Sequence, residues 1–347
     1  MSKEIPIKNI FYLLIYAWDR YQEGKSISIE TEKSPDLPNL LSDFLFKLMC
    51  RVIKKGLDKD YFEEIEITNI LRGKILFNEV IKKNLLKQKK LCVEIDNLAT
   101  NTIINRYIKT TILSLKRNNK VTSINRKNLS LILKYLEDIE PIKNIKNIEK
   151  YIKLNRNNSH YLFPLQVCSL INNITIPSKN PGEFIFKDFR DDELRMSDIF
   201  EKFVRNFYKI EQKEFKVKKE KIKIDAQGVK EFMELMPGKE TDVTLRSKKR
   251  TIIIDAKYYK EPLKEYYGKF KPKPDNINQI SDYLKNMEIL NFPDNEAEGI
   301  LLYPVVSSQK KIEKTSGIYQ GHKLTLYSLN LIQDWNNIHK DLINLIN

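Results

Sequence analysis

Two acidic residues and a lysine are spaced so that they could act together on a metal ion. Asp242 precedes the apolar run 252–254, and Asp255 and Lys257 follow it. Two carboxylates a few ångströms apart repel each other, and together they bind a hard divalent cation such as Mg²⁺. The ion would polarise a phosphate, and Lys257 would offset the charge that develops there. The predicted chemistry is phosphodiester hydrolysis with Mg²⁺ or Mn²⁺.

Two adjacent strands must position these residues. The isoleucines 252–254 are β-branched and predict a buried strand. Side chains alternate along a strand, so Asp255 and Lys257 project from the same side. Residues 241–245 are also strand-like, and a polar, basic connection separates the two segments, as in a hairpin. Asp242 is therefore expected beside Asp255.

This pattern is weak when taken alone. Asp and Lys at positions i and i+2 also occur on solvated strand edges. A charged pair directly after three isoleucines favours a site, because charges at strand ends in α/β folds tend to mark sites. The solvated edge is the alternative.

Two predicted helices could add side chains to this site. In the first, residues 196–210, Glu201 lies beside an apolar stripe and Arg205 follows at i+4. Glu201 either reaches the metal site through a water molecule or forms an ordinary surface ion pair with Arg205. In the second helix, Gln279 and Tyr283 share one face and could contact phosphate or the metal-bound water.

The charge of the chain suits a polyanionic partner. The 347 residues include 61 Lys and Arg against 46 Asp and Glu, a net charge of +15. Richness in Ile, Asn and Lys would also arise from an AT-rich genome, so the charge is weak support. Four lysines between the Glu201 helix and Asp242 could line a DNA path or be a solvated face: Lys216, Lys218, Lys219 and Lys221.

The length and the breaker residues predict two domains. Residues 177–182 are the clearest linker. Residues 1–180 are expected to form an α+β domain, and residues 181–347 an α/β domain with a mixed sheet flanked by helices. Expected helices are 40–54, 101–117, 129–147, 149–171 with a break near Pro164, 193–211, 276–290 and one from 331; expected late strands are 299–306 and 323–329.

Several classes of protein are excluded. Cys50, Cys92 and Cys168 lack CxxC spacing, which argues against a disulfide framework or a structural zinc site and fits a reducing cytoplasm. The longest apolar run, 11–18, is too short to span a bilayer and predicts a buried helix rather than a signal peptide. No glycine-rich phosphate loop occurs, so this chain should not bind a nucleotide itself.

The order of these elements resembles the PD-(D/E)XK nuclease superfamily. The pair Gln279 and Tyr283 is similar to the Q-x-x-x-Y element of its RecB-like branch, whereas Thr241 stands where the name pattern has Pro. The resemblance implies a metal site formed by Asp242, Asp255 and the backbone carbonyl of Ala256. It implies catalytic roles for Asp242, Asp255, Lys257, Glu201, Gln279 and Tyr283.

Further segments resemble the McrC family, the nuclease subunit of McrBC-type modification-dependent restriction systems. These segments are 5–19, 71–75, 92–96, 105–109 and 255–259. The resemblance implies a partner, a hexameric AAA+ GTPase ring of the McrB type that reads modified double-stranded DNA. It also implies that domain 1–180 docks on this ring and stimulates GTP hydrolysis, for which Arg72 is a candidate. The alternative is that Arg72, next to Gly73, only forms part of a turn.

The sequence therefore predicts a cytoplasmic, Mg²⁺-dependent DNA endonuclease subunit of a GTP-dependent restriction complex directed at modified cytosine. One alternative is a non-catalytic adaptor that binds DNA or the ring and keeps a decayed nuclease fold. Another is a stand-alone nuclease that needs no nucleotide. The presence of Asp242, Asp255 and Lys257 together favours the first, because decay would usually remove one of them.

Overall fold

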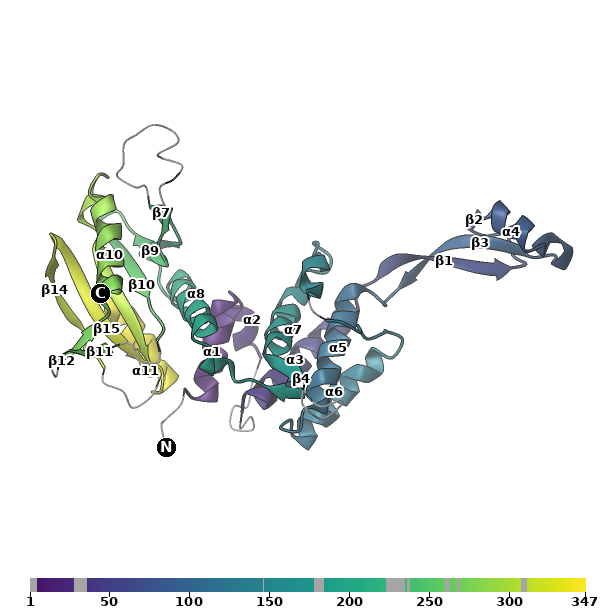
Figure 1. Cartoon of the computed structure of the whole chain (residues 1–347), viewed down its shortest axis with the longest axis horizontal. Helices are drawn as coiled ribbons and strands as arrows, with labels where there is room; N and C mark the ends of the chain where they lie inside the picture. Colours follow the sequence, from purple (N-terminus) through teal and green to yellow (C-terminus); the bar gives the residue numbers. More distant parts are fainter. Residues whose placement is uncertain are drawn as a thin grey trace. The chain divides into compact units, whose positions relative to one another are not determined.

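The computed structural model divides the chain into two compact units (Figure 1). Unit 1 comprises residues 1–37 and 188–347, and unit 2 comprises residues 38–187. The structure describes residues 5–27, 36–145, 147–177, 184–222, 235, 238–259, 263–266, 269–306 and 311–347. The units differ from the predicted domains 1–180 and 181–347, because residues 1–37 belong to unit 1. Most of the predicted linker 177–182 lies outside the described residues.

Unit 1 is built on a mixed sheet, as predicted. The described part of this sheet has the strand order β14-β15-β13-β10-β9-β6. The central strands β10, β13 and β15 run parallel, and the outer pairs are antiparallel. The strands are β6 (Lys216–Lys218), β9 (Val243–Arg246), β10 (Thr251–Ala256), β13 (Glu298–Val305), β14 (Thr315–Tyr319) and β15 (His322–Asn330).

Strand β10 is the buried centre of this sheet, and all its residues are buried. It forms the predicted hairpin with β9, in a register that pairs Ile254 with Val243. The hairpin connection is closed by Ser247, whose backbone N–H donates to the carbonyl of Arg250 at 2.9 Å. This register brings the residue before Val243 and the residue after Ile254 to the same end of the sheet.

Helix α10 (Pro274–Met287) covers one face of the sheet. Its residues Ile280 and Leu284 pack with Ile253 of β10 and Leu301 of β13. Gly299 of β13 permits this close approach, because a Cβ atom there would lie 2.9 Å from a methyl group of Leu284. The side chains of β10 that alternate with Ile253 point to the other face of the sheet, which a second layer of helices covers.

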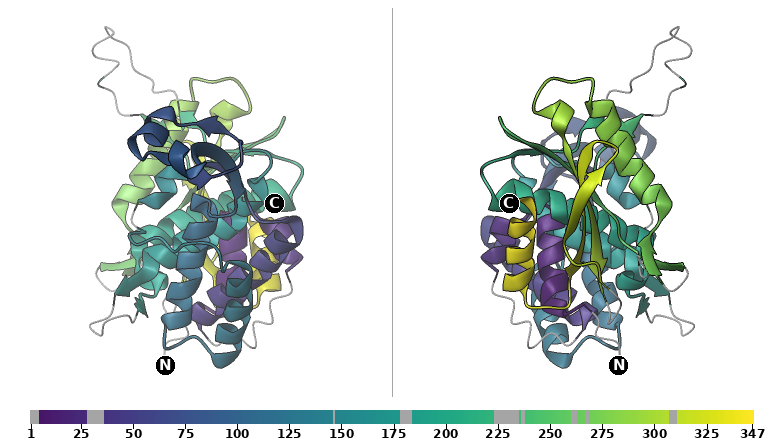
Figure 2. Two further views of the ribbon diagram at one scale, coloured as in Figure 1. Left: turned by 90° about the vertical axis from the view of Figure 1, so that its right-hand side faces the viewer. Right: turned by 90° about the vertical axis from the view of Figure 1, so that its left-hand side faces the viewer.

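That layer contains α1 (Ile7–Ala17), α8 (Glu193–Glu211) and α11 (Trp335–Ile346) (Figure 2). Aromatic side chains join the three helices: the ring of Tyr16 lies 5.8 Å from Phe203 and 5.7 Å from Trp335. Aromatic residues bury large apolar areas, so this cluster is the reason that the N-terminal helix folds with unit 1. The run 11–18 is thus the buried helix that the sequence predicts.

Unit 2 contains a group of helices and a projecting sheet. The helices are α3 (Leu37–Lys55), α5 (Ile103–Arg117), α6 (Ser123–Tyr135) and α7 (Leu162–Ile174), and a short β4 (Thr175–Pro177) pairs with β5 (Phe184–Phe186). The predicted helix 129–147 is wrong beyond Tyr135, and the predicted helix 149–171 is wrong before Leu162. The predicted break near Pro164 is wrong as well, because Pro164 lies in the first turn of α7, where proline is tolerated. In the described part of the chain, no helix combines the length and apolar character needed to cross a bilayer.

The projecting sheet, residues 60–99, is called the arm. Strands β1 (Asp60–Thr68) and β3 (Leu91–Ala99) pair along their whole length and run away from the helices of unit 2 (Figure 1). Strand β2 (Lys74–Ile75) and helix α4 (Phe77–Lys82) complete the arm. Many of its large apolar side chains are exposed: Tyr61, Phe62, Ile65, Ile67, Ile70, Leu71, Phe77, Ile81, Leu86 and Leu98. Exposed apolar groups of this kind are typical of interaction surfaces.

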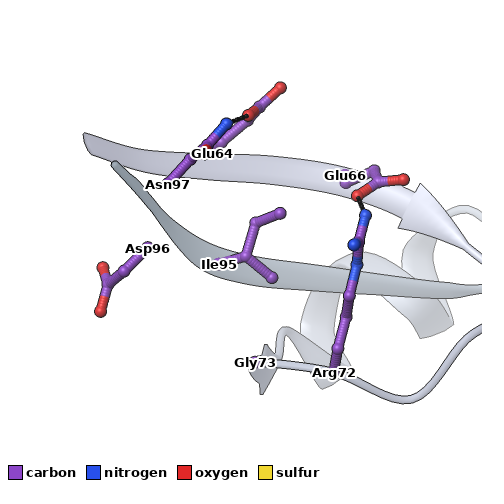
Figure 3. A pocket seen from close by; sticks show the side chains of 7 residues that line it. All are labelled: Glu64, Glu66, Arg72, Gly73, Ile95, Asp96 and Asn97. Carbon is purple, nitrogen blue, oxygen red and sulfur yellow. Dashed lines mark hydrogen bonds and ion pairs between the residues drawn. The ribbon is translucent and has the colours of Figure 1, made fainter. Parts of the chain in front are cut away.

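A pocket of about 630 Å³ lies on the arm. It is lined by Glu64, Glu66, Arg72, Gly73, Ile95, Asp96 and Asn97 (Figure 3). Arg72 pairs with Glu66, and Asn97 donates to Glu64 at 3.2 Å. Gly73 has a φ of +64°, and a Cβ atom there would overlap the carbonyl oxygen of Glu94, so the turn that presents Arg72 requires glycine.

Candidate active site

The β9–β10 hairpin brings the predicted aspartates and lysine together. Asp242 lies directly before β9, and its Oδ2 accepts a hydrogen bond from the backbone N–H of Ala256 at 3.0 Å. Asp255 lies at the end of β10, and the Nζ of Lys257 is 3.0 Å from its Oδ1. The predicted neighbourhood of the three residues is confirmed, although the roles assigned to them remain predictions.

Asp255 is a buried carboxylate with an incomplete set of partners. Its side chain is 0% exposed, so a solvated strand edge is excluded for this residue. Lys257 makes an ion pair with it, but neither carboxylate oxygen accepts a hydrogen bond of good geometry within the described residues. A buried carboxylate with so few hydrogen bonds lowers the free energy of unfolding by several kcal/mol unless a further cation or donor compensates its charge.

The donor atoms present fit a hard cation. Asp242 and Asp255 offer carboxylate oxygens, the ligand type that Mg²⁺ prefers. Nowhere in the described ranges do three or more His, Cys, Asp or Glu side chains form a group that could hold a metal. The pair of carboxylates thus suits an ion that keeps water and phosphate oxygens as its other ligands. The carbonyl of Ala256 remains a predicted ligand.

Burial and mutual repulsion shift the protonation of the carboxylates. Burial raises the pKa of Asp242 to about 7, with further increases from Asp255 and Glu201, while Lys257 and the Ala256 N–H oppose them. Burial also raises the pKa of Asp255, against the effect of Lys257. Burial alone would lower the pKa of Lys257, but Asp255 and Asp242 outweigh it and the pKa is raised. Lys257 is therefore a cation at neutral pH.

Asp242→Asn should stabilise the metal-free chain at pH 8. Because the folded-state pKa of Asp242, about 7, exceeds its ordinary value of 3.8, folding takes up a proton between these values. The free energy of unfolding of the native chain therefore falls as pH rises from 3.8 to about 7. The neutral variant avoids this loss, which is roughly 2–4 kcal/mol for one half-buried carboxylate.

Denaturant unfolding in EDTA at pH 4 and pH 8 measures this effect. The gain should be full at pH 8 and nearly absent at pH 4. Asp198→Asn is the matched control, because Asp198 is 58% exposed and pairs with Lys202 on α8. An equal gain at both pH values would contradict the assignment of the raised pKa to Asp242.

Glu201 lies at this site and is paired with two cations. Its Oε1 is 3.1 Å from Nη1 of Arg205 and 3.3 Å from Nζ of Lys219. The same Nη1 donates to the backbone carbonyl of Asp242 at 3.2 Å, and Lys219 also reaches Glu240 at 3.4 Å. The ion pair with Arg205 forms, but both side chains are only about one-fifth exposed, so it is not an ordinary surface pair. Glu201 is close enough to raise the pKa of Asp242, and its contact with the metal through water remains a prediction.

Gln279 and Tyr283 share one face of α10, as predicted. The Nε2 of Gln279 donates to the hydroxyl of Tyr283 at 2.6 Å. That hydroxyl donates to the backbone carbonyl of Glu240 at 3.0 Å. Burial raises the pKa of Tyr283, and the charges of Asp255 and Asp242 raise it further. The pair therefore joins α10 to the segment that leads into Asp242.

The four predicted DNA-binding lysines are not equivalent. Lys216 and Lys218 are exposed on β6, the edge strand beside β9, and Lys221 is exposed on β7 (Lys221–Ile222). Lys219 lies between these strands and contacts two carboxylates at the site, Glu201 and Glu240. DNA binding by the four lysines remains a prediction.

The sequence did not indicate the contact between Arg205 and the Asp242 carbonyl, or the position of Glu240. Spacing of i+4 predicts the pairing of Arg205 with Glu201, but Asp242 is 37 residues further on. The distance in space between Arg205 and Asp242 depends on tertiary packing alone. The i+4 spacing of Glu201 and Arg205 predicts only a contact within their own helix.

The fold and the site together define an α/β protein that holds two acidic side chains and a lysine at the end of a central strand. The chain belongs to the family of McrBC 5-methylcytosine restriction system components, whose profile matches residues 8–304. It is 31% identical to the type IV methyl-directed restriction enzyme EcoKMcrBC of Escherichia coli K12, over 98% of this chain and 97% of that protein. The predicted resemblance to the McrC family is thereby confirmed, and that to the PD-(D/E)XK superfamily remains a prediction.

A solved structure supports the fold. A chain from a Thermococcus gammatolerans assembly of McrB AAA+ hexamers with bound McrC superposes with a TM-score of 0.62 at 16% identity. The match covers 98% of this chain and 75% of that chain. The chain is therefore a restriction-system component with an α/β fold of known type.

Proposed function

We propose that this chain is the Mg²⁺-dependent DNA endonuclease subunit of a GTP-dependent restriction complex directed at modified cytosine. The observation that carries the proposal is the buried carboxylate of Asp255. It lies close to Asp242 and beside Lys257, whose Nζ is 3.0 Å from its Oδ1, yet neither of its oxygens accepts a hydrogen bond of good geometry in the part of the chain described. A divalent cation would supply the missing charge and complete this site.

The chemistry follows from the side chains. Asp242 and Asp255 would hold the ion, which when bound acts as a Lewis acid toward a phosphodiester. Lys257 stays protonated, because its pKa is raised by Asp255 and Asp242 despite burial. It therefore serves as a fixed positive charge and hydrogen-bond donor near the phosphate, not as the base that removes a proton. Tyr283 and Gln279 hold the neighbouring backbone at Glu240.

The arm supports a partner of the McrB type. The curated relative is named as an McrBC enzyme, and the solved relative comes from an assembly with AAA+ hexamers. Unit 2 presents exposed apolar side chains on the arm and Arg72 at a turn that requires glycine. We assign this surface to contact with a GTPase ring and Arg72 to stimulation of its GTP hydrolysis. DNA recognition would then lie on the partner chain.

A reconstituted cleavage assay tests the proposal. The chain, mixed with the McrB-like GTPase of its own system, should cut plasmid DNA that carries 5-methylcytosine when Mg²⁺ and GTP are both present. Unmodified plasmid should stay intact, and EDTA should stop the reaction. The readout is conversion of supercoiled plasmid to linear DNA.

Two outcomes would contradict the proposal. Stimulation of GTP hydrolysis without any DNA cleavage would favour the non-catalytic adaptor. Efficient cleavage by the chain alone, without the GTPase or GTP, would favour a stand-alone nuclease.

A further inference from the structure

The segment that carries Asp242 lies outside the strand ladder. The pairing of β9 with β10 begins at Val243, and the preceding short strand β8 (Lys239–Glu240) pairs with β7 instead. Asp242 is therefore placed between two ladders. A residue in that position needs other contacts to fix its backbone and its side chain.

Three elements supply these contacts. The backbone N–H of Ala256 on β10 donates to the carboxylate of Asp242 at 3.0 Å. The backbone N–H of Thr241 donates to the carbonyl of Glu220 at 2.9 Å, which ties the preceding residue to the segment between β6 and β7. Arg205 of α8 donates to the backbone carbonyl of Asp242 at 3.2 Å. The side chains of Thr241 and Tyr283 hold the residues just before Asp242, and Arg205 adds a side-chain contact to the backbone of Asp242 itself.

Arg205 is suited to hold this carbonyl in place. Its side chain is 19% exposed, and its Nη1 lies between Glu201 Oε1 at 3.1 Å and the Asp242 carbonyl at 3.2 Å. One terminal guanidinium nitrogen carries two hydrogens, so it can donate to both acceptors at once. Charge-assisted hydrogen bonds of this kind are stronger than neutral ones.

The helix behind Arg205 is firmly packed. Phe200, Phe203 and Phe207 on α8 are completely buried, so the base of the Arg205 side chain is fixed relative to the sheet. Glu201, one turn earlier, orients the guanidinium through the ion pair. Arg205 thus holds the backbone of Asp242, a predicted metal ligand, at a fixed position relative to the rigid helix α8.

We infer that Arg205 is a positioning residue that fixes Asp242 for binding of the divalent cation. The inference rests on the proposed function, because it assumes that Asp242 is a ligand. Residues that orient metal ligands typically contribute about 10–100-fold in metal affinity or activity. Arg205 is assigned no contact with DNA or with the reacting atoms.

Binding of Mn²⁺ alone, followed by electron paramagnetic resonance of the free ion, gives a readout separate from activity. Arg205→Ala should weaken Mn²⁺ binding about 10–100-fold. In the reconstituted assay, the Mg²⁺ concentration for half-maximal cleavage should rise by a similar factor, while the KM for DNA stays within about twofold. A purely structural role would lower the melting temperature without this separation.

Two further variants sharpen the test. Arg205→Lys keeps the charge and the pairing with Glu201. Its ammonium group is on a shorter side chain and lacks the planar, multiple donors of guanidinium, so this variant should recover little of the Mn²⁺ affinity that Arg205→Ala loses. Lys202→Ala is the matched control, because Lys202 forms an i,i+4 ion pair with Asp198 at 2.7 Å on the same helix. It should bind Mn²⁺ as the native chain does.

The results separate the two claims. Native chain that binds no Mn²⁺ and cuts no DNA would overturn both the proposed function and this inference. Native chain that binds and cuts, with unchanged Mn²⁺ affinity in Arg205→Ala, would overturn the inference alone. If the alanine variant does not fold, Arg205→Lys decides: native affinity in that variant would refute the need for a contact to both acceptors.

Discussion

Asp255→Asn should reduce DNA cleavage by at least about 10³-fold while the chain keeps its fold and its partner. The substitution preserves the shape of the side chain but removes the charge that a divalent cation requires. Electrostatic stabilisation by a metal contributes several kcal/mol to the transition state, and each 1.36 kcal/mol is about tenfold in rate. Loss of a ligand at the centre of the site should therefore remove almost all activity.

The stability of the metal-free Asp255→Asn chain should be kept or raised, although its cleavage is lost. Asp255 is completely buried, and burial raises its pKa because the charged form is poorly solvated. A neutral amide at this position avoids that cost in the metal-free chain. The melting temperature in EDTA at pH 8 should therefore be equal to or above that of the native chain, which distinguishes loss of chemistry from loss of fold.

Single-turnover cleavage with the partner GTPase measures the first effect, and GTP hydrolysis by the mixture reports partner binding. Asp198→Asn serves again as the control, because this exposed carboxylate pairs with Lys202 on α8. Cleavage within about tenfold of native in Asp255→Asn would exclude the assigned metal site, since ligand loss is expected to cost several kcal/mol.

The local part of this site could be predicted from the sequence. The isoleucines before Asp255 define a buried strand, and the polar connection defines a hairpin, so Asp242 and Asp255 must meet at one end. The faces of α8 and α10 also follow from their apolar periodicity. These features depend on residues within one or two adjacent elements, where spacing in the chain controls spacing in the fold.

Features set by packing between distant segments could not be predicted. Residues 1–37 belong to unit 1 because Tyr16 packs against Phe203 and Trp335. Apolar periodicity predicts that a helix face is buried, but it does not predict which element covers that face. The contact between Arg205 and Asp242 depends on the same packing of α8. The helix predicted for 129–147 fails after Tyr135, where turns replace the helical pattern.

Lys257→Ala should lower the rate of cleavage by about 10²–10³-fold and leave metal binding intact at pH 8. The raised pKa of Lys257, caused by Asp255 and Asp242 against the effect of burial, keeps it charged in the native chain. The alanine variant loses a positive charge near the phosphate but keeps both carboxylates. Because Lys257 lowers the pKa of Asp242 and Asp255, its removal should make protons compete more strongly with the metal below neutral pH.

Cleavage rates at saturating Mg²⁺ and Mn²⁺ binding at pH 6 and pH 8 measure these two effects separately. Lys257→Arg keeps the charge but not the compact ammonium group, so it should recover only part of the rate. Lys285→Ala is the matched control, since Lys285 pairs with the exposed Glu288 at 2.7 Å at the far end of α10. Loss of Mn²⁺ binding at pH 8 in Lys257→Ala would show that the lysine acts by holding the ligands. Retained binding with a slow rate would place its effect on the charge that develops at the phosphate.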